Sequence, residues 1–267
     1  QNGSIQLSNR AVDISSEDVE NVEVLKGPSA SALYGSLAAN GVVLITTKKA
    51  KPGMGEGGKV SSVNFTASVD RNSNGGRDGT EILQKKYGQL GKGSLSYGRL
   101  RPVDTPKYDH VEELLKPHWS NAQSVSFSGG SPEFSYYGSG ARSDISGLID
   151  NSAYAKHDVR ANVMLLPFSS LSITSNSNFM TIDNNLPQDG SNRDGLMLGA
   201  LRTPPEFNNT MVTNPDGSQH RYAGYDNPLW SVENNKFNTT IERFVHSTQA
   251  SLTIEWLSVN GGIGMDR

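Results

Sequence analysis

The chain has 267 residues, no cysteine and a formal net charge of −3 at pH 7. The lack of cysteine excludes a disulfide framework, a thiolate metal site and a cysteine nucleophile. The small net charge and the lack of a basic block argue against a nucleic-acid partner. No apolar run approaches the length of a transmembrane helix.

The first segment with a clear pattern covers residues 22–49. It predicts a short strand at 22–25, a tight turn, a helical turn ending near Tyr34, a second turn, and a strand at 42–45. Glycine and proline interrupt regular structure, because proline lacks an N–H and glycine tolerates positive φ. The residues that would shape these turns are Gly27, Pro28, Tyr34, Gly35, Asn40 and Gly41.

Seven downstream segments alternate between apolar and polar residues. In 62–70, for example, Val63, Phe65 and Val69 share one face, and serine, threonine and asparagine occupy the other. A period of two predicts strands with one apolar face and one polar, water-exposed face. The expected strands are 62–70, 124–128, 134–143, 157–165, 171–179, 244–256 and 257–265, of which 134–143 is the least regular.

The connections between these strands alternate in length. The short turns are expected at 129–132, 167–170 and 256–258, and the longer connections at 72–121, 145–151 and 183–240. Short turns at one rim and long loops at the other are typical of transmembrane β-barrels, whose strands need roughly ten residues to cross the bilayer. The alternative is a soluble antiparallel sandwich, which would also alternate.

Two separated motifs carry a family resemblance. Ala38-Ala39-Asn40-Gly41, followed by Val-Val-Leu-Ile-Thr-Thr-Lys-Lys, resembles the end of the plug domain of TonB-dependent outer-membrane transporters, in the form found in the SusC/RagA branch. A second match lies at 200–205, with Asp226-Asn-Pro-Leu-Trp230 beyond it. The alternative for the first motif is a βαβ turn in a soluble α/β protein.

The resemblance implies a mainly β protein, with an antiparallel transmembrane barrel of 22 strands around an α+β plug. Residues 1–50 would be the C-terminal part of the plug, 51–58 a linker, and 59–267 the first third of the barrel, with about seven strands and long extracellular loops at 72–121 and 183–240. Open strand edges leave unpaired N–H and C=O groups in lipid. We therefore expect this sequence to be a fragment.

The resemblance also implies a function. It is TonB-dependent import of a large nutrient, a glycan or a peptide, across the outer membrane of a Gram-negative bacterium, without enzymatic activity. The implied partners are TonB, through a segment upstream of Gln1, a SusD-like surface lipoprotein acting as a lid, and outer-membrane lipid. A signal-transducing receptor and a non-transporting scaffold or adhesin remain open. The sequence upstream of Gln1 would distinguish the three functions. A TonB box would support transport, a signalling domain would support the receptor, and the absence of both would support the scaffold.

Residues 70–81 match the calcium-loop pattern D-x-[DN]-x-[DN]-G followed by glutamate. Such spacing turns alternate oxygens toward a cation and returns a glutamate as a bidentate ligand. The candidate ligands are Asp70, Asn72, Asn74, Gly76, Asp78 and Glu81. The alternative is a polar, glycine-rich loop at the outer rim, and calcium is the one cofactor that the sequence suggests.

The remaining candidates lie in the long connections. Tyr222, Tyr225 and Trp230 cluster beside Asp226 and Asn227, and such groups suit a sugar, because aromatic faces stack on sugar rings and polar side chains bind hydroxyls. The alternative is that these aromatic residues pack the loop onto its neighbours. His110 and His118 match no zinc motif and are expected to be solvated loop residues. The sequence contains no recognisable catalytic arrangement.

Overall fold

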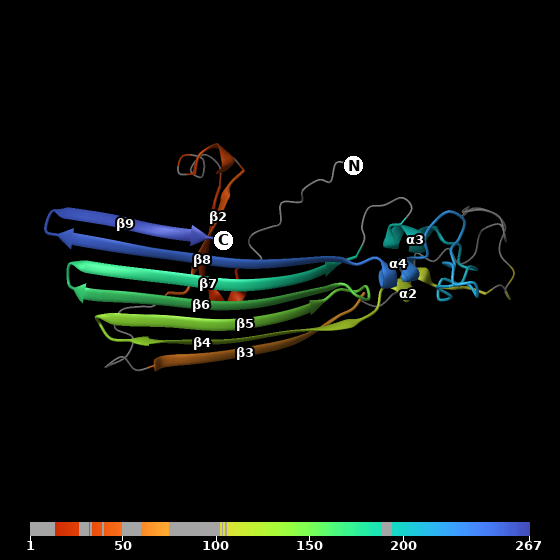
Figure 1. The fold of residues 1–267 in the computed structure, drawn as a ribbon, viewed down its shortest axis with the longest axis horizontal. Coiled ribbons are helices and arrows are strands. Elements are labelled where there is room, and N and C mark those ends of the chain that lie inside the picture. Colours follow the sequence, from red (N-terminus) through yellow and green to blue (C-terminus); the bar gives the residue numbers. More distant parts are fainter. Residues whose placement is uncertain are drawn as a thin grey trace.

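The structure, a computed structural model, describes residues 14–26, 32, 34–38, 40–49, 60–74, 102, 104, 106–187 and 194–267 (Figure 1). Two sheets and a group of short helices make up this part of the chain. The small sheet comprises β1 (Val19–Leu25), preceded by the short 3-10 helix η2 (Ser16–Asp18), and β2 (Val42–Thr47), preceded by η3 (Ser36–Ala38). The large sheet comprises β3 (Val60–Asn72), β4 (His118–Gly130), β5 (Phe134–Ser146), β6 (Ala153–Phe168), β7 (Leu171–Leu186), β8 (Phe237–Ile254) and β9 (Leu257–Asp266). The helices are α2 (His110–Leu114), α3 (Leu196–Arg202) and α4 (Pro228–Asn234).

The N-terminal strands pair as an antiparallel hairpin, with Leu25 opposite Val42 and Val19 opposite Thr47. This arrangement excludes the βαβ alternative, in which the two strands would run parallel. Gly41, directly before β2, has a φ of 103°, and a Cβ there would lie 3.0 Å from the carbonyl oxygen of Leu25. The turn into β2 therefore requires glycine for both its backbone conformation and its closeness to β1.

The large sheet is an antiparallel meander in which β3 to β9 lie side by side in chain order. All seven strands expected from the alternating pattern are confirmed, and β4, β6, β7 and β8 extend well beyond the alternating segments. A sandwich would divide its strands between two packed sheets, whereas these seven form one. The soluble sandwich is therefore excluded. Within the described residues the sheet is open, with β3 and β9 at its edges.

The connections alternate as the sequence predicted. Residues 131–133, 169–170 and 255–256 form tight turns at one end of the sheet. The three helices lie at the other end, in the long connections before β4 and β8 (Figure 1). Strands of 13 to 18 residues from β3 to β8 exceed the roughly ten needed to cross a bilayer. The strands are therefore longer than the thickness of a hydrocarbon core requires.

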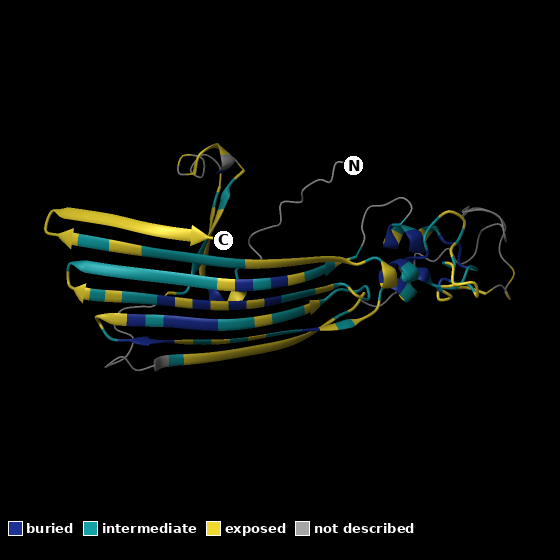
Figure 2. Cartoon of the chain, in the orientation of Figure 1, coloured by how far each residue is buried: buried dark blue, intermediate teal, exposed yellow. Residues whose placement is uncertain are grey.

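The two faces of the large sheet differ in polarity. One face carries exposed apolar side chains, including Val63 (65% exposed), Phe65 (71%) and Val159 (59%). The other carries serine, threonine and asparagine, and the dark-blue residues of β5 and β6 in Figure 2 are buried in part under the N-terminal segment. We call the face under the N-terminal segment the inner face and the apolar one the outer face.

One group of polar side chains interrupts the apolar outer face on β7 and β8. The two ring nitrogens of His246 lie 2.9 Å from the Ser177 hydroxyl and 3.0 Å from the Thr248 hydroxyl, and Thr248 donates to Ser175. A polar group in an apolar environment is costly unless it is hydrogen-bonded. Because these four groups bond to one another, they avoid most of that cost.

The helices form a small core of their own. Leu114 of α2, Leu196 and Ala200 of α3, and Val232 of α4 are buried together. Ile149, in the connection between β5 and β6, packs against them. Three connections far apart in sequence thus form one compact loop assembly. None of the helices in the described residues has the length and apolar character to cross a membrane.

Candidate functional site

The N-terminal hairpin is attached to the inner face of the large sheet through Asp18, the last residue of η2. The Tyr137 hydroxyl donates to Asp18 Oδ1 at 2.8 Å, and Arg160 Nε lies 3.1 Å from Asp18 Oδ2. Asp18 is 1% exposed and Arg160 is 9% exposed. Water therefore screens this ion pair little, and removing one partner would leave an uncompensated buried charge, at a cost of about 3–5 kcal/mol.

Lys48, directly after β2, completes the attachment. Its backbone N–H donates to the Asp18 carbonyl at 2.7 Å and its ammonium group donates to the Glu17 carbonyl at 2.7 Å. The side-chain amide of Asn162 donates to the Lys48 carbonyl at 2.8 Å. Both ends of the β1–β2 hairpin are thus held at one place, and we call Asp18, Lys48, Tyr137, Arg160 and Asn162 the anchor.

The alternation of β5 and β6 explains why these side chains converge. Exposed and buried residues alternate strictly from Lys156 to Asn162, so Asp158, Arg160 and Asn162 all point to the inner face. Tyr137 pairs directly with Asn162 on the neighbouring strand, which places both on the same face. Lys156 and Asp158 are also almost fully buried. Around Asp18 the sheet therefore presents two positive charges and one negative charge.

The anchor attaches the hairpin to the sheet and is not arranged as a catalytic centre. It combines hydrogen bonds with an ion pair and contains no nucleophile paired with a base. A cavity of about 110 Å³ lies next to it, between residues 15–17 and polar residues of β3, β4 and β5, including Thr66, Ser68 and Ser124. The N-terminal segment therefore lies across several strands of the sheet.

The predicted aromatic cluster lies in the loop assembly, and two of its members have ring contacts there. The Arg202 guanidinium lies 4.8 Å from the centroid of the Tyr225 ring. Tyr222 meets Phe207 edge to face at 5.5 Å, and Phe207 stacks on His220 at 4.6 Å. For Tyr222 and Tyr225 these contacts favour the packing alternative. Asp226 lies 3.7 Å from Arg221, and Trp230 belongs to α4.

Asn227 is buried, at 1% exposed, and acts as the N-cap of α4. Its side-chain oxygen accepts from the N–H groups of Leu229 and Trp230, and its nitrogen donates to the carbonyls of Asn209 and His220. Its carboxamide is therefore fully used within the loop assembly. Contact of the other four residues with a ligand stays a prediction.

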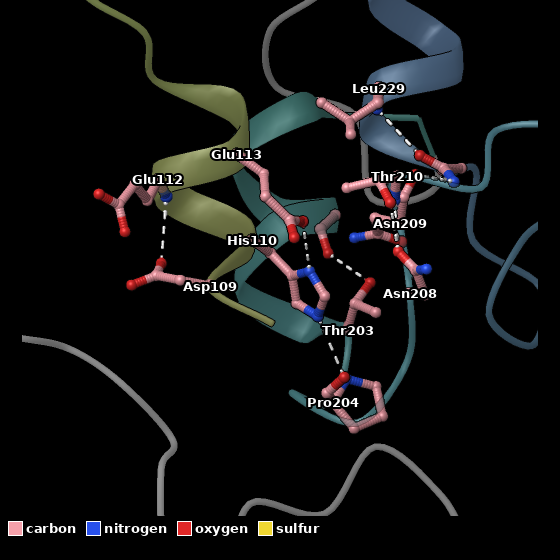
Figure 3. A network of polar contacts seen from close by, with 12 residues as sticks. Asp109, His110, Glu112, Glu113, Thr203, Pro204, Asn208, Asn209, Thr210 and Leu229 are labelled. Atoms are coloured by element: carbon pink, nitrogen blue, oxygen red, sulfur yellow. Dashed lines mark hydrogen bonds and ion pairs between the residues drawn. The ribbon is translucent and has the colours of Figure 1, made fainter. Parts of the chain in front are cut away.

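His110 was expected to be solvated, and the structure corrects this. It is 5% exposed, with Nδ1 3.1 Å from Glu113 Oε2 and Nε2 3.1 Å from the carbonyl oxygen of Pro204 (Figure 3). The contact joins α2 to the chain just after α3. His118 is the first residue of β4 rather than a loop residue, and its Nε2 lies 3.0 Å from Asp150 Oδ1. Both histidines therefore connect segments that are far apart in sequence.

The other predicted sites are only partly described. Tyr34, Gly35 and Asn40 are exposed, and Gly35 has a φ of 77°, whereas Gly27 and Pro28 lie outside the described residues. Of the calcium pattern, Asp70 and Asn72 belong to β3 and Asn74 follows it, whereas Gly76, Asp78 and Glu81 lie outside the described residues. No cluster of three acidic or histidine side chains suited to a metal occurs in the described parts of the chain. Calcium binding stays a prediction.

Sequence reasoning missed the anchor. The alternating pattern had placed Asp158, Arg160 and Asn162 on a polar face, but it assigned them no partner. The available signal was that this face of β6 is charged, whereas neighbouring inner faces are rich in serine. Asp18 lies more than 100 residues from its partners, so no local pattern could connect them.

A family model described as the TonB-dependent receptor plug domain matches residues 1–42. The TonB-dependent receptor SusC of Bacteroides thetaiotaomicron is 27% identical over 242 residues, which cover 86% of this chain and 23% of that protein. The TonB-dependent receptor P26 of Formosa agariphila is 29% identical over 252 residues, covering 91% of this chain and 24% of that protein. These similarities extend through both sheets.

The fold is similar to that of the RagAB peptide transporter, with a TM-score of 0.67 and 24% sequence identity, over 93% of this chain and 32% of that one. A second RagAB structure, of the peptide importer in its closed-closed state, gives a TM-score of 0.66 at 20% identity. The chain spans about a quarter of the length of its curated relatives. The plug match, the open antiparallel sheet and these relatives together support a TonB-dependent receptor of the SusC/RagA type.

Proposed function

We propose that the receptor containing this chain imports a large nutrient, a glycan or a peptide, across the outer membrane, using force transmitted by TonB. TonB-dependent receptors are outer-membrane β-barrels and are not enzymes. The observation that best supports the proposal is the anchor, because it seats a plug segment on the polar inner face of the barrel wall. A plug in this place blocks the lumen, so a solute can pass only after part of the plug has moved.

We further propose that the loop assembly faces outward and contacts a SusD-like lipoprotein lid. Met197, Leu201 and Met211 each expose 40% or more of their surface there. These exposed apolar side chains would suit contact with a protein partner if they form one patch. In this proposal Tyr222, Tyr225, Asp226 and Trp230 contribute to binding either the nutrient or the lid.

The residues of the N-terminal part keep the roles proposed from the sequence. Residues 1–50 belong to the plug, residues 51–58 link it to the barrel, and residues 59–267 supply barrel wall and loops. The turn residues Gly35, Asn40 and Gly41 shape the hairpin and are proposed to touch no nutrient. Calcium at residues 70–81 would order the start of the first long loop.

The test measures uptake in the bacterium from which the receptor comes, using labelled oligosaccharides and oligopeptides too large for porins. Deletion of the receptor gene is expected to abolish uptake of one class, and complementation to restore it. Collapsing the proton gradient should stop uptake and leave surface binding intact. Uptake that continues without the receptor, or without the gradient, would contradict the proposal. Affinity purification from detergent-solubilised outer membrane would identify the lid.

A further inference from the structure

A pocket with a volume of about 620 Å³ lies in the loop assembly, within the connection between α3 and α4. One short stretch of the chain lines it, through Asn214, Ser218, Gln219, His220, Arg221 and Ala223. Five of these six side chains can form hydrogen bonds, and one carries a positive charge. The lining therefore suits a polar or charged group of a ligand rather than an apolar one.

The wall of this pocket is held in place from several sides. The His220 ring stacks on Phe207 with centroids 4.6 Å apart, and its Nδ1 lies 2.8 Å from Asn214 Oδ1. The amide nitrogen of Asn214 donates to the Gln219 carbonyl, and that of Asn227 donates to the His220 carbonyl. The backbone around the pocket is thus fixed without a ligand, which lowers the entropic cost of binding one.

Arg221 is the charged residue of the pocket. Its side chain is 44% exposed, and Nη1 lies 3.7 Å from Asp226 Oδ1. At this distance the two charges attract each other but form no hydrogen bond. Within the described residues the guanidinium therefore keeps its N–H donors unused. These donors form a planar fork, whose geometry matches the two oxygens of a carboxylate.

Gln219 supplies a second donor beside Arg221. Its Nε2 is buried and has no hydrogen-bond partner among the described residues. A buried donor without a partner is unfavourable. A half-turn of the carboxamide exchanges its nitrogen with its oxygen, which would move the donor toward the pocket that Gln219 lines. A ligand with an acceptor oxygen in the pocket would then satisfy it.

We propose that this pocket binds a carboxylate group of the nutrient and that Arg221 determines this specificity. The Arg221 fork holds both carboxylate oxygens, Gln219 donates to one of them, and His220 forms part of the fixed wall. This inference rests on the proposed import and names the chemical group by which the nutrient is selected. Glycans carry such a group on uronic acid residues, and peptides carry it at the C-terminus and on acidic side chains.

The test measures binding by isothermal titration calorimetry, with the full-length receptor as it is purified from the outer membrane. One pair of probes is an oligogalacturonate and its methyl ester. The other is a set of oligopeptides without acidic side chains and the same peptides with amidated C-termini. In one pair the acid should bind roughly tenfold or more tightly than its neutral form, because the neutral form loses the charge-assisted contact with Arg221. The pair that shows this preference identifies the class of nutrient.

Variants then assign the preference to Arg221. Arg221→Gln should abolish the preference for the acid and leave the affinity for the neutral form unchanged. Arg221→Lys should retain part of the preference, because lysine keeps the charge but lacks the planar fork. Lys236→Gln is the matched control, since Lys236 is exposed in the same long connection, carries the same charge and does not line the pocket. This control should keep the full preference.

The outcomes separate this inference from the proposed function. Equal affinity for acid and neutral forms in both pairs, or a preference that Arg221→Gln leaves intact, would overturn the inference. An equal loss of preference in Lys236→Gln would also overturn it, because the preference would then reflect the overall charge of the loops. Uptake of the labelled acid that continues after collapse of the proton gradient would instead overturn the proposed function and leave the specificity of the pocket standing.

Discussion

At the scale of single residues, the buried asparagine Asn227 organises the loop assembly. Its carboxamide joins the start of α4 to two backbone carbonyls, those of Asn209 and His220. The four hydrogen bonds of this carboxamide join neutral amide and backbone groups. The loop assembly is thereby fixed from inside rather than by surface contacts.

Replacing Asn227 by alanine should loosen α4. Loss of the cap and of two further hydrogen bonds is expected to cost about 2–4 kcal/mol locally. Hydrogen exchange measured by mass spectrometry should then show protection of residues 228–234 reduced at least roughly tenfold. Asn208→Ala is the matched control, because among the described residues the Asn208 side chain accepts from Thr210, two residues away. Equal protection in both variants would contradict this role of Asn227.

Asp150 makes a pH-sensitive connection between two loops. The Lys116 ammonium lies 2.6 Å from Asp150 Oδ2, and this hydrogen bond, with the nearby His118, holds the pKa of Asp150 below its usual value. A carboxyl with a lowered folded-state pKa stabilises the fold above its unfolded pKa, roughly 3.9. The contribution is lost as pH falls through the lower, folded-state pKa.

We therefore expect the connection between residues 116 and 150 to be intact at neutral pH and to weaken below about pH 3.9. The contribution is at most about 1 kcal/mol, because both side chains are substantially exposed. Two-dimensional NMR or protease sensitivity of this loop, followed from pH 6 to pH 3, would measure it. Asp150→Asn should show the weakened state at every pH, and an unchanged pH profile in that variant would exclude Asp150 as the cause.

At the scale of elements, β6 illustrates how one strand serves two environments. Its inner side chains hold the plug hairpin, while Val159, Ala161 and Leu165 face outward and are exposed. Toward the long-loop end of β6, the next outward-facing residue after Val159 is the polar His157. The apolar band on this strand is therefore bounded by a polar residue where it approaches the outer rim.

A charge introduced into that band should cost more at its centre than at its edge. Ala161→Arg is expected to destabilise the barrel by about 2–4 kcal/mol, whereas His157→Arg should cost about 0–1 kcal/mol. Both positions are exposed on the same face of the same strand and lie at different depths along it. Unfolding of the full receptor by guanidinium in phospholipid bilayers would measure the difference. Equal costs would mean that this face does not contact lipid.

At the scale of the whole molecule, the proposed function predicts that the two ends of the large sheet face different compartments. The tight turns lie at one end and the loop assembly at the other (Figure 1). The chain contains no cysteine, so an introduced cysteine within it reports its own position alone. Ser169, in a tight turn, and Ser218, in the last long connection, are both exposed.

Ser218→Cys should react with a membrane-impermeant maleimide on intact cells. Ser169→Cys should react only after the outer membrane has been permeabilised, because short turns of such barrels face the periplasm. The extent of labelling is read by mass spectrometry of the purified receptor. Labelling of Ser169→Cys on intact cells would reverse the orientation of the wall. Lack of labelling of both variants on intact cells would instead place a lid or another covering over the loop assembly.

The sequence by itself determined the strands, their faces and the alternation of turns and loops. These features are local. A period of two assigns Val63 and Phe65 to one face of a strand whatever packs nearby, and Gly41 can end a turn because glycine adopts the positive φ that the turn needs. The strand ends were less predictable. Residues 238–240 of β8 and 183–185 of β7 are polar on both faces, and they form strands because they pair with each other.

Only the tertiary structure decided which residues make the functional contacts. Asp18 is buried because the hairpin lies against β5 and β6, and its partners at 137 and 160 depend on a sheet register that no short segment contains. In the same way, the sequence places Asn227 and His110 in long connections, and only the packing of α2, α3 and α4 against one another shows that both residues are buried. Alternation specifies which way a side chain points, but burial and pairing depend on what folds against it.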